Sequence, residues 1–372
     1  MARRGGAPPI AFFVLPPALA IVATLLALEA LLALFHPVPF STERNMYFVA
    51  DPYTGYRLMP NSHGAWGPGV PADVNANGHR DVPTTVAKPD GVFRILALGD
   101  SFTVGADVLA EQAYPKMLER LLAARTGRRV QAINAGVGGW DPFMYAQYYE
   151  HYGRAFRPDL VLVGFFVGND AYSPITRVED TPTALAGRRV SRAAAELGPL
   201  AAAAVWLTEH SHLVRLLLQR SPEPIEVTRE RCDRFPDEYL AIQRERLANH
   251  TTPDATRLAL ADDALRQIAR IEALADADGI PLLVAFLPDE NQVNPALRRA
   301  LLSADEERTY DFTMPQALLT RTFAAAGVAT LDLLPAFLAD PRCLYVNTSH
   351  WTPEGHALAA AVLAERLAPA IR

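Results

Sequence analysis

The chain has 372 residues and a formal net charge of −6, and half of its residues are hydrophobic while only 20% are charged. This composition is too apolar for a disordered protein and too weakly charged for one that binds nucleic acid by neutralising phosphates. At roughly 150 residues per domain, the length corresponds to about two domains, or to one large domain with an insertion.

The first predicted element is an apolar run over residues 10–35 that contains one ionisable residue, Glu29. As a helix rising ~1.5 Å per residue it would be about 39 Å long, more than a hydrocarbon core of ~30 Å requires. We therefore expect a signal anchor that spans a membrane, rather than a cleaved signal, whose apolar core needs only ~7–15 residues. Arg3 and Arg4 precede the run, so the positive-inside rule places residues 1–9 in the cytoplasm and the rest outside it, in the periplasm or its equivalent.

The exported part begins with residues 36–90, which lack helical or strand periodicity and are expected to form an extended lead-in on the surface of the domain after it. From residue 91, short apolar strands alternate with helices, which indicates a parallel sheet with helices on both faces. Residues 171–256 break this alternation, so we interpret them as an insertion, with an Ala-rich helical stretch at 190–219 and a charged stretch at 226–246. The strand candidates are 93–98, 130–134, 159–167, 281–287 and 328–332, and the main helix candidates are 114–124, 257–277 and 353–367.

Polar residues stand at three of the strand ends and before the last helix. Ser101 follows the first strand, Gly136 the second and Asn169 the third, and His350 precedes the last helix. In open α/β sheets, ligands bind beyond the carboxyl ends of the strands. A serine hydroxyl, N–H and amide donors for an oxyanion, and a histidine base are the groups that serine acyl chemistry requires.

With these residues the chain resembles the SGNH, or GDSL-type, hydrolase superfamily over roughly residues 91–372. Ser101, Gly136, Asn169 and His350 match its four characteristic positions in chain order. The resemblance implies a three-layer α/β/α, flavodoxin-like fold with Ser101 as nucleophile and His350 as general base. It also implies an oxyanion hole made by the N–H groups of Ser101 and Gly136 and the amide of Asn169.

The chain departs from the family where the catalytic acid is expected. An aspartate usually stands two or three residues before the histidine, and here those positions are Thr348 and Asn347. An asparagine carbonyl can orient the imidazole but cannot stabilise the imidazolium by charge. Three alternatives remain: a Ser–His dyad assisted by Asn347, which we place first; a substitute carboxylate such as Asp332 or Asp340; and a weakened or inactive enzyme.

The predicted function is a membrane-anchored, extracytoplasmic serine esterase or deacylase acting on O-acyl groups of an envelope glycan or lipid. The lead-in is also similar to that of membrane-anchored members of the group, through residues 51–57, 60–61 and 77–81. One alternative is an O-acyltransferase of a cell-envelope polysaccharide that works with an integral-membrane acyl-donor partner. Another is a non-catalytic, glycan-binding protein with the same fold.

Three further expectations concern ligands and cysteines. A phosphate-binding loop at 99–105 would leave Asn169 and His350 without a role, so we set it aside. Neither a metal nor a cofactor is expected, because the sequence has no HExxH motif and no clustered His and Cys residues. Export would expose Cys232 and Cys343 to an oxidising compartment, where they could form a disulfide.

Overall fold

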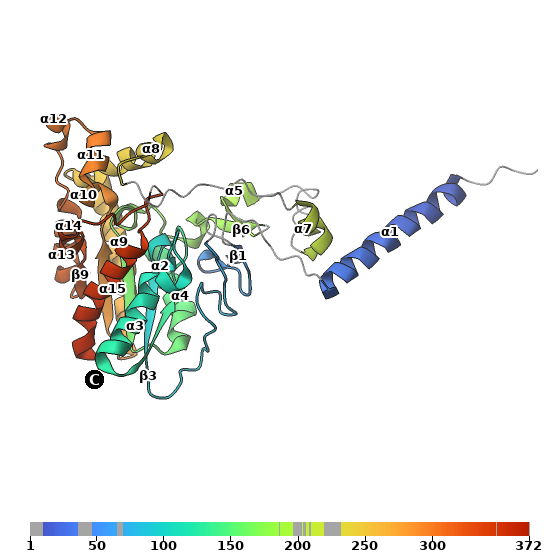
Figure 1. Cartoon of the computed structure of the whole chain (residues 1–372), viewed down its shortest axis with the longest axis horizontal. Helices are drawn as coiled ribbons and strands as arrows, with labels where there is room; N and C mark the ends of the chain where they lie inside the picture. Colours follow the sequence, from blue (N-terminus) through green and yellow to red (C-terminus); the bar gives the residue numbers. More distant parts are fainter. Residues whose placement is uncertain are drawn as a thin grey trace, which may run out of the picture.

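The computed structural model of the chain describes residues 10–35, 47–64, 70–185, 187–195, 203, 206–207, 210–218, 232–346 and 348–371. A five-stranded parallel sheet in the order β4-β3-β5-β8-β9 forms its centre, with helices on both faces (Figure 1). The strands are β3 (Val92–Gly99), β4 (Arg129–Asn134), β5 (Leu160–Phe166), β8 (Leu282–Leu287) and β9 (Thr330–Asp332).

The two faces of the sheet carry separate hydrophobic cores because side chains alternate along each strand. In β5, Val161, Val163 and Phe165 join one core, whereas Leu160 and Leu162 join the other. The first core is covered by α4 (Pro142–His151), α9 (Ala255–Ala277) and α13 (Met314–Ala325), and the second by α3 (Tyr114–Thr126), α14 (Leu334–Ala339) and α15 (Pro353–Leu367). The predicted three-layer α/β/α arrangement is confirmed.

The other described elements are the long N-terminal helix and several short helices. The remaining α-helices described are α1 (Ile10–Phe35), α2 (Ser101–Val104), α5 (Arg192–Ala195), α7 (His212–Leu218), α8 (Asp237–Arg246), α10 (Glu290–Val293), α11 (Pro295–Leu301) and α12 (Ala304–Glu307). The 3-10 turns are η1 (Ala110–Gln112), η2 (Gly153–Phe156), η3 (Asp170–Tyr172), η4 (Val178–Asp180), η5 (Leu247–His250) and η6 (Ala368–Ala370).

The lead-in differs from the expected surface segment. It contains an antiparallel hairpin, β1 (Phe48–Asp51) and β2 (Gly55–Leu58), and the side chain of Tyr56 is fully buried in the first core. The backbone carbonyl of Tyr56 accepts a hydrogen bond from Trp140 Nε1 at 3.1 Å. Strands of four residues are too short to reveal a period in the sequence, so the sequence does not predict this hairpin.

The insertion contains a β-hairpin just before the predicted helical stretch at 190–219. Strands β6 (Thr183–Leu185) and β7 (Arg188–Val190) pair antiparallel. Gly187 lies in their turn with φ +75°, a left-handed conformation that glycine adopts easily and that favours a tight hairpin. Residues 219–231, which include the start of the charged stretch at 226–246, lie outside the described residues.

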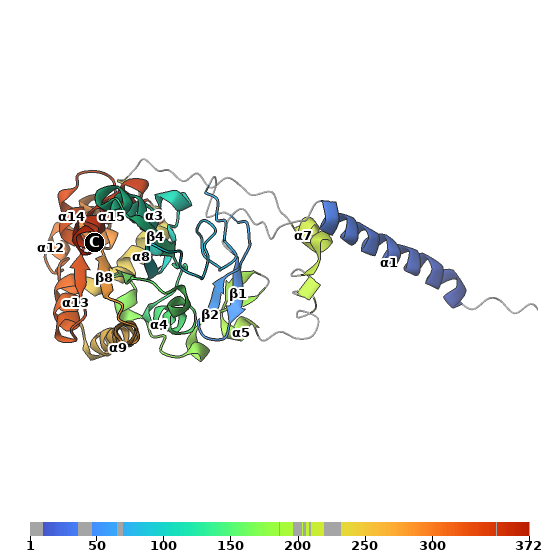
Figure 2. The same ribbon diagram turned by 90° about the horizontal axis from the view of Figure 1, so that it is seen from below.

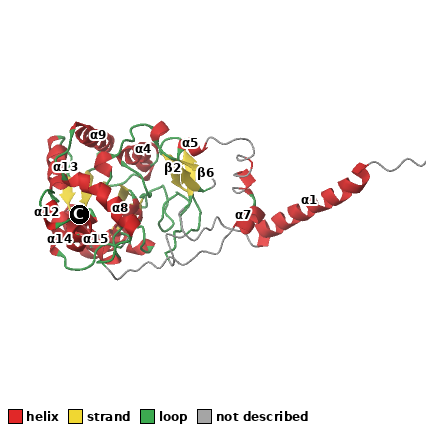
Figure 3. Ribbon diagram, turned by 90° about the horizontal axis from the view of Figure 1, so that it is seen from above, coloured by secondary structure: helices red, strands yellow, loops and turns green. Residues whose placement is uncertain are grey.

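Helix α1 extends away from the rest of the chain (Figures 2 and 3). Residues 15–35 are apolar and long enough to cross a membrane, and they are not buried against the rest of the protein. A membrane anchor and a signal sequence both have these properties. Cys232 and Cys343, 111 residues apart in the sequence, are joined in a disulfide with a Cα–Cα distance of 5.9 Å.

Candidate active site

The predicted nucleophile, Ser101, stands where strand β3 passes into helix α2. Asp100 caps this helix, and its Oδ1 accepts the N–H of Phe102 at 2.9 Å. Gly105 ends the helix with φ +79°, a conformation that a residue with a Cβ adopts at a cost. The cap and the glycine therefore confine Ser101 to a short turn at the carboxyl edge of the sheet.

His350 reaches Ser101 from the C-terminal part of the chain. A backbone bridge pairs Tyr345 with Trp351, and Val346 N donates to the carbonyl of His350 at 2.8 Å, so the loop before α15 is tight. Nε2 of His350 lies 3.0 Å from Oγ of Ser101. At this distance the serine hydroxyl can donate to a neutral imidazole, as nucleophile activation requires.

The carboxylate that contacts the imidazole is Asp107, six residues after Ser101. Its Oδ2 lies 2.8 Å from Nδ1 of His350 and accepts the hydroxyl of Thr348 at 2.5 Å. Asp107 is buried and has φ +63°, a left-handed conformation that aspartate tolerates better than most residues. A proton on Nδ1 directed at this carboxylate orients the lone pair of Nε2 toward the serine hydroxyl.

The acid therefore does not come from the places that the sequence suggested. Asp332 caps the start of α14 and Asp340 forms a salt bridge with a neighbouring arginine, so neither is the substitute carboxylate. Asn347 lies outside the described residues. Spacing around the histidine could not have indicated Asp107, because it approaches from the nucleophile's own loop. The available signal was an aspartate just beyond the glycine that ends the nucleophile helix.

The three predicted oxyanion donors follow β3, β4 and β5. Gly136 packs so closely on α2 that a Cβ atom there would lie 2.4 Å from the backbone nitrogen of Val104, so no larger residue fits. Its N–H donates to Oδ1 of Asn134 at 3.1 Å, and an oxyanion would have to compete with this acceptor. Asn169 is the residue just before η3 and is exposed. Its amide and the N–H groups of Ser101 and Gly136 thus lie after three neighbouring strands of the sheet.

A buried carboxyl links the predicted site residues electrostatically. Burial raises the pKa of Asp100 to about 6, while the Phe102 N–H, the charge of His350 and the side chain of Asn169 lower it. His350 and Asn169 thus act on the same carboxyl group, next to Ser101 in the sequence. Within the described part of the chain, no group of three or more His, Cys, Asp or Glu side chains is arranged to hold a metal ion.

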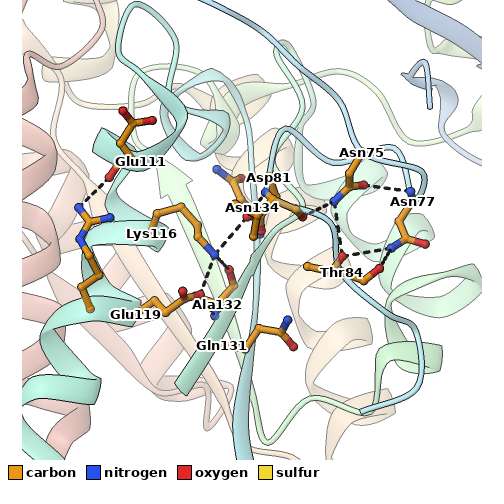
Figure 4. Close-up of polar contacts among 12 residues, drawn as sticks. Asn75, Asn77, Asp81, Thr84, Glu111, Lys116, Glu119, Gln131, Ala132 and Asn134 are labelled. Atoms are coloured by element: carbon orange, nitrogen blue, oxygen red, sulfur yellow. Dashed lines mark hydrogen bonds and ion pairs between the residues drawn. The ribbon is translucent and has the colours of Figure 1, made fainter. Parts of the chain in front are cut away.

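A buried ion network joins the lead-in to strand β4, which the loop with Gly136 follows (Figure 4). Lys116 Nζ lies 3.1 Å from Oδ1 of Asp81 and 2.6 Å from Oε2 of Glu119, and it donates to the carbonyl of Ala132 at 3.1 Å. Oδ2 of Asp81 accepts the N–H of Asn134 at 3.0 Å. The side chain of Asn134 also accepts the N–H of Gly136. The lead-in therefore helps to fix the loop that holds Gly136.

A second lead-in residue, Arg80, holds the loop that carries the acid. Its fully buried guanidinium donates to four backbone carbonyls. The acceptors are Pro71 (2.7 Å), Val104 (3.1 Å), Gly105 (2.6 Å) and Val108 (2.7 Å). Two of them end the nucleophile helix and one directly follows Asp107. Arg80 therefore fixes the separation between nucleophile and acid without touching either side chain.

We predict that Arg80→Lys lowers kcat for p-nitrophenyl acetate by about 10- to 100-fold with little change in KM. A lysine ammonium has three donors on a flexible stem and cannot reproduce a planar contact with four carbonyls, so the acid loop would shift. Arg299→Lys, at an exposed position on α11, is the matched control. A folded Arg80→Lys protein with wild-type kcat would contradict this positioning role.

Helix α8 of the insertion supports the loop before His350. Nε2 of Gln243 donates to the hydroxyl of Ser349 at 3.1 Å and to the Tyr239 hydroxyl at 3.0 Å. The Tyr239 hydroxyl in turn donates to the carboxyl group of Glu290. Glu290 is buried, and this burial raises its pKa to about 7 although the hydrogen bond from Tyr239 lowers it. The hydrogen bonds that join the insertion to the loop before His350 thus end on a carboxyl group that titrates near neutral pH.

We predict that the contribution of Glu290 to the free energy of unfolding falls as pH rises from 4.5 to 7, because the buried carboxyl group must then carry a charge. The pKa of Glu290 is higher in the folded state than in the unfolded state, so the folded protein retains a proton there that the unfolded chain has lost. The free energy of unfolding of the wild type, minus that of Glu290→Gln, should fall by roughly 2–3 kcal/mol over this range and stay constant above it. Urea unfolding of both proteins at several pH values measures it, and a difference that rises with pH would refute the prediction.

A known protein family matches most of the chain. The family model of the GDSL-like lipase/acylhydrolase family matches residues 97–358, which is more than half of the chain and contains Ser101, Asp107, Gly136, Asn169 and His350. The chain therefore belongs to the GDSL-like lipase/acylhydrolase family. The family supports an ester-cleaving hydrolase as the class of enzyme. No curated protein matches the chain.

Solved structures of similar fold have little sequence in common with this chain. The lipase/acylhydrolase from Enterococcus faecalis is 14% identical, covering 74% of this chain and 96% of its own, with a TM-score of 0.38. A catalytic mutant of Axe2, an acetylxylan esterase from Geobacillus stearothermophilus, is 13% identical. Its match covers 74% of this chain and 93% of the esterase, with a TM-score of 0.39. A GDSL-like lipase from Bacteroides thetaiotaomicron is 11% identical, and its match covers 75% of this chain and 89% of the lipase, with a TM-score of 0.35.

Proposed function

We propose that the chain is a membrane-anchored, extracytoplasmic serine esterase or deacylase with Ser101 as nucleophile, His350 as general base and Asp107 as acid. The observation that carries the proposal is the unbroken series of contacts from Ser101 Oγ to His350 Nε2, at 3.0 Å, and from His350 Nδ1 to Asp107 Oδ2, at 2.8 Å. This arrangement fits proton removal from the hydroxyl during attack on an acyl carbon.

The reaction would proceed in two halves. In the first, Oγ of Ser101 attacks the ester carbonyl while His350 takes the hydroxyl proton and passes it to the departing alcohol, leaving an acyl-enzyme. In the second, His350 removes a proton from water as the water oxygen attacks the acyl carbon. His350 then returns the proton to Oγ of Ser101 as the Oγ–acyl bond breaks and the carboxylic acid leaves. The oxyanion of each tetrahedral intermediate would be held by the N–H groups of Ser101 and Gly136 and the Asn169 amide, and each such donor is worth roughly 3–4 kcal/mol in comparable enzymes.

For the substrate, we propose an O-acyl group on an envelope glycan or lipid. A membrane-spanning α1 with a cytoplasmic N-terminus would place the catalytic domain outside the cytoplasm, where such acylated polymers occur. The disulfide between Cys232 and Cys343 is consistent with an oxidising compartment. A reporter that is active only in the periplasm, fused after residue 372, tests the location. An active cytoplasmic reporter at the same position would refute export.

An O-acyltransferase uses the same acyl-enzyme and is the second candidate. A helix long enough to span a membrane favours it, because it would bring the site close to an integral-membrane acyl donor. The non-catalytic alternative was suggested by the residues just before His350. Thr348 instead donates to Asp107, which itself contacts the imidazole, so that reason no longer applies.

Covalent trapping distinguishes these candidates in the full-length protein in detergent. One fluorophosphonate molecule should attach to each protein, and peptide mass spectrometry should locate the adduct on Ser101. The Ser101→Ala protein should not react. Acetyl groups from p-nitrophenyl acetate that leave Ser101 in water alone identify an esterase. Acetyl groups that leave only when an oligosaccharide is added identify a transferase. Failure of Ser101 to react with either reagent would refute both.

A further inference from the structure

Glu29, the single ionisable residue of the apolar run, is bound by the segment that begins helix α7. Its Oε2 accepts the hydroxyl of Ser211 at 2.7 Å and the N–H of Leu213 at 3.0 Å, and its Oε1 accepts the N–H of His212 at 2.6 Å. Ser211 also caps α7, because its hydroxyl accepts the N–H of Val214 at 3.1 Å. A carboxylate within an apolar helix is thus satisfied by a segment about 180 residues further along the chain.

The views of the structure agree that α7 lies beside the end of α1 that is nearer to the catalytic domain (Figures 1, 2 and 3). Glu29 precedes the last residue of α1, Phe35, by six positions, or about 9 Å of helix. The helix exceeds a hydrocarbon core of ~30 Å by a similar length. If α1 spans a membrane, Glu29 therefore lies close to the boundary between hydrocarbon and headgroups.

Apolar side chains in α7 and just before it are exposed. Leu217 is 74% exposed, and Leu216 and Leu207 are 42% and 44% exposed. Trp206 is 58% exposed and stacks on the ring of His210, with 4.7 Å between the ring centroids. Tryptophan is enriched where a membrane meets water, and exposed apolar side chains that lie together mark surfaces that bind membranes or proteins.

We propose that residues 206–207 and 210–218 form an interfacial membrane contact, which Glu29 holds against α1 on the outer side of the bilayer. The partner is the lipid bilayer itself, whose acyl chains and glycerol region would cover Trp206, Leu216 and Leu217. This rests on the proposed function in one respect, since it requires α1 to remain in the chain as a membrane anchor. Through this contact, the insertion would attach the catalytic domain to the membrane at a second point.

Fluorescent probes in the full-length chain test the contact in liposomes of phosphatidylethanolamine and phosphatidylglycerol. Both native cysteines form the disulfide, so a cysteine at Leu217→Cys supplies the one thiol that an NBD reagent can label. Leu338→Cys is the matched control, because Leu338 is 53% exposed on α14 of the catalytic domain. We expect the probe at 217 to emit at shorter wavelength and to be quenched by lipids with a nitroxide near the headgroup. The probe at 338 should be quenched by iodide instead.

Glu29→Leu in the Leu217→Cys chain tests the role of the carboxylate. The probe should lose its lipid quenching and become accessible to iodide while the protein still floats with the liposomes. A probe at 217 that iodide quenches as strongly as the probe at 338 would overturn the membrane contact. Lipid quenching unchanged by Glu29→Leu would overturn the role of Glu29. A chain that no longer floats, or that has lost α1 by mass, would instead refute the anchor, and hydrolysis of p-nitrophenyl acetate reports on catalysis separately.

Discussion

Ser101→Ala should lower the hydrolysis of p-nitrophenyl acetate by at least about three orders of magnitude. The hydroxyl is the atom placed 3.0 Å from the base, and alanine leaves the imidazole without a proton to remove. Oxyanion donors and substrate binding would remain, so a small residual rate above that in water is expected. The measurement compares kcat/KM of the full-length proteins in detergent.

A matched control separates this effect from a general effect of replacing serine by alanine. Ser303 is exposed, caps α12 through the N–H of Glu306, and lies in no part of the site. Ser303→Ala should therefore retain wild-type kcat/KM. Equal rates for wild type and Ser101→Ala would mean that Ser101 is not the nucleophile, and the proposed mechanism would fail.

Asp107→Asn should lower kcat by about 10³- to 10⁴-fold with a smaller change in KM. The amide keeps the size of the side chain but loses the charge that stabilises the imidazolium, and its NH₂ group can favour the wrong tautomer. Asparagine also tolerates a φ of +63°, so the backbone need not change. The loss would therefore report the missing carboxylate rather than a distorted loop, and circular dichroism would check that the fold is kept.

The rival acids provide the controls for this prediction. Asp332→Asn and Asp340→Asn should leave kcat near the wild-type value, because these carboxylates bind a backbone N–H and an arginine. Asn347→Asp should maintain or raise activity, since it would restore a carboxylate where the family usually has one. Wild-type kcat in Asp107→Asn, or a large loss in Asn347→Asp, would favour the dyad assisted by Asn347.

The fold and most of the candidate site could be predicted because their signals are local. Strand β5 is one apolar run, and Ser101 and Asn169 each follow such a strand directly. Asp107 gave no comparable signal, since its contact with His350 joins residues 243 positions apart in the chain. Arg80 was missed for a related reason. A single charged residue in an irregular segment is usually solvated, and only the folded structure shows the carbonyls it binds.

The position of Asp107 also has a consequence for folding kinetics. Ser101 and Asp107 lie six residues apart in one turn, so the nucleophile and the acid can be brought together as soon as that turn forms. His350 is the member that must arrive from 249 residues away from the serine. On the proposed mechanism, recovery of esterase activity during refolding would then follow one event, the docking of the C-terminal segment. The sheet and its first helices could form earlier without contributing to that signal.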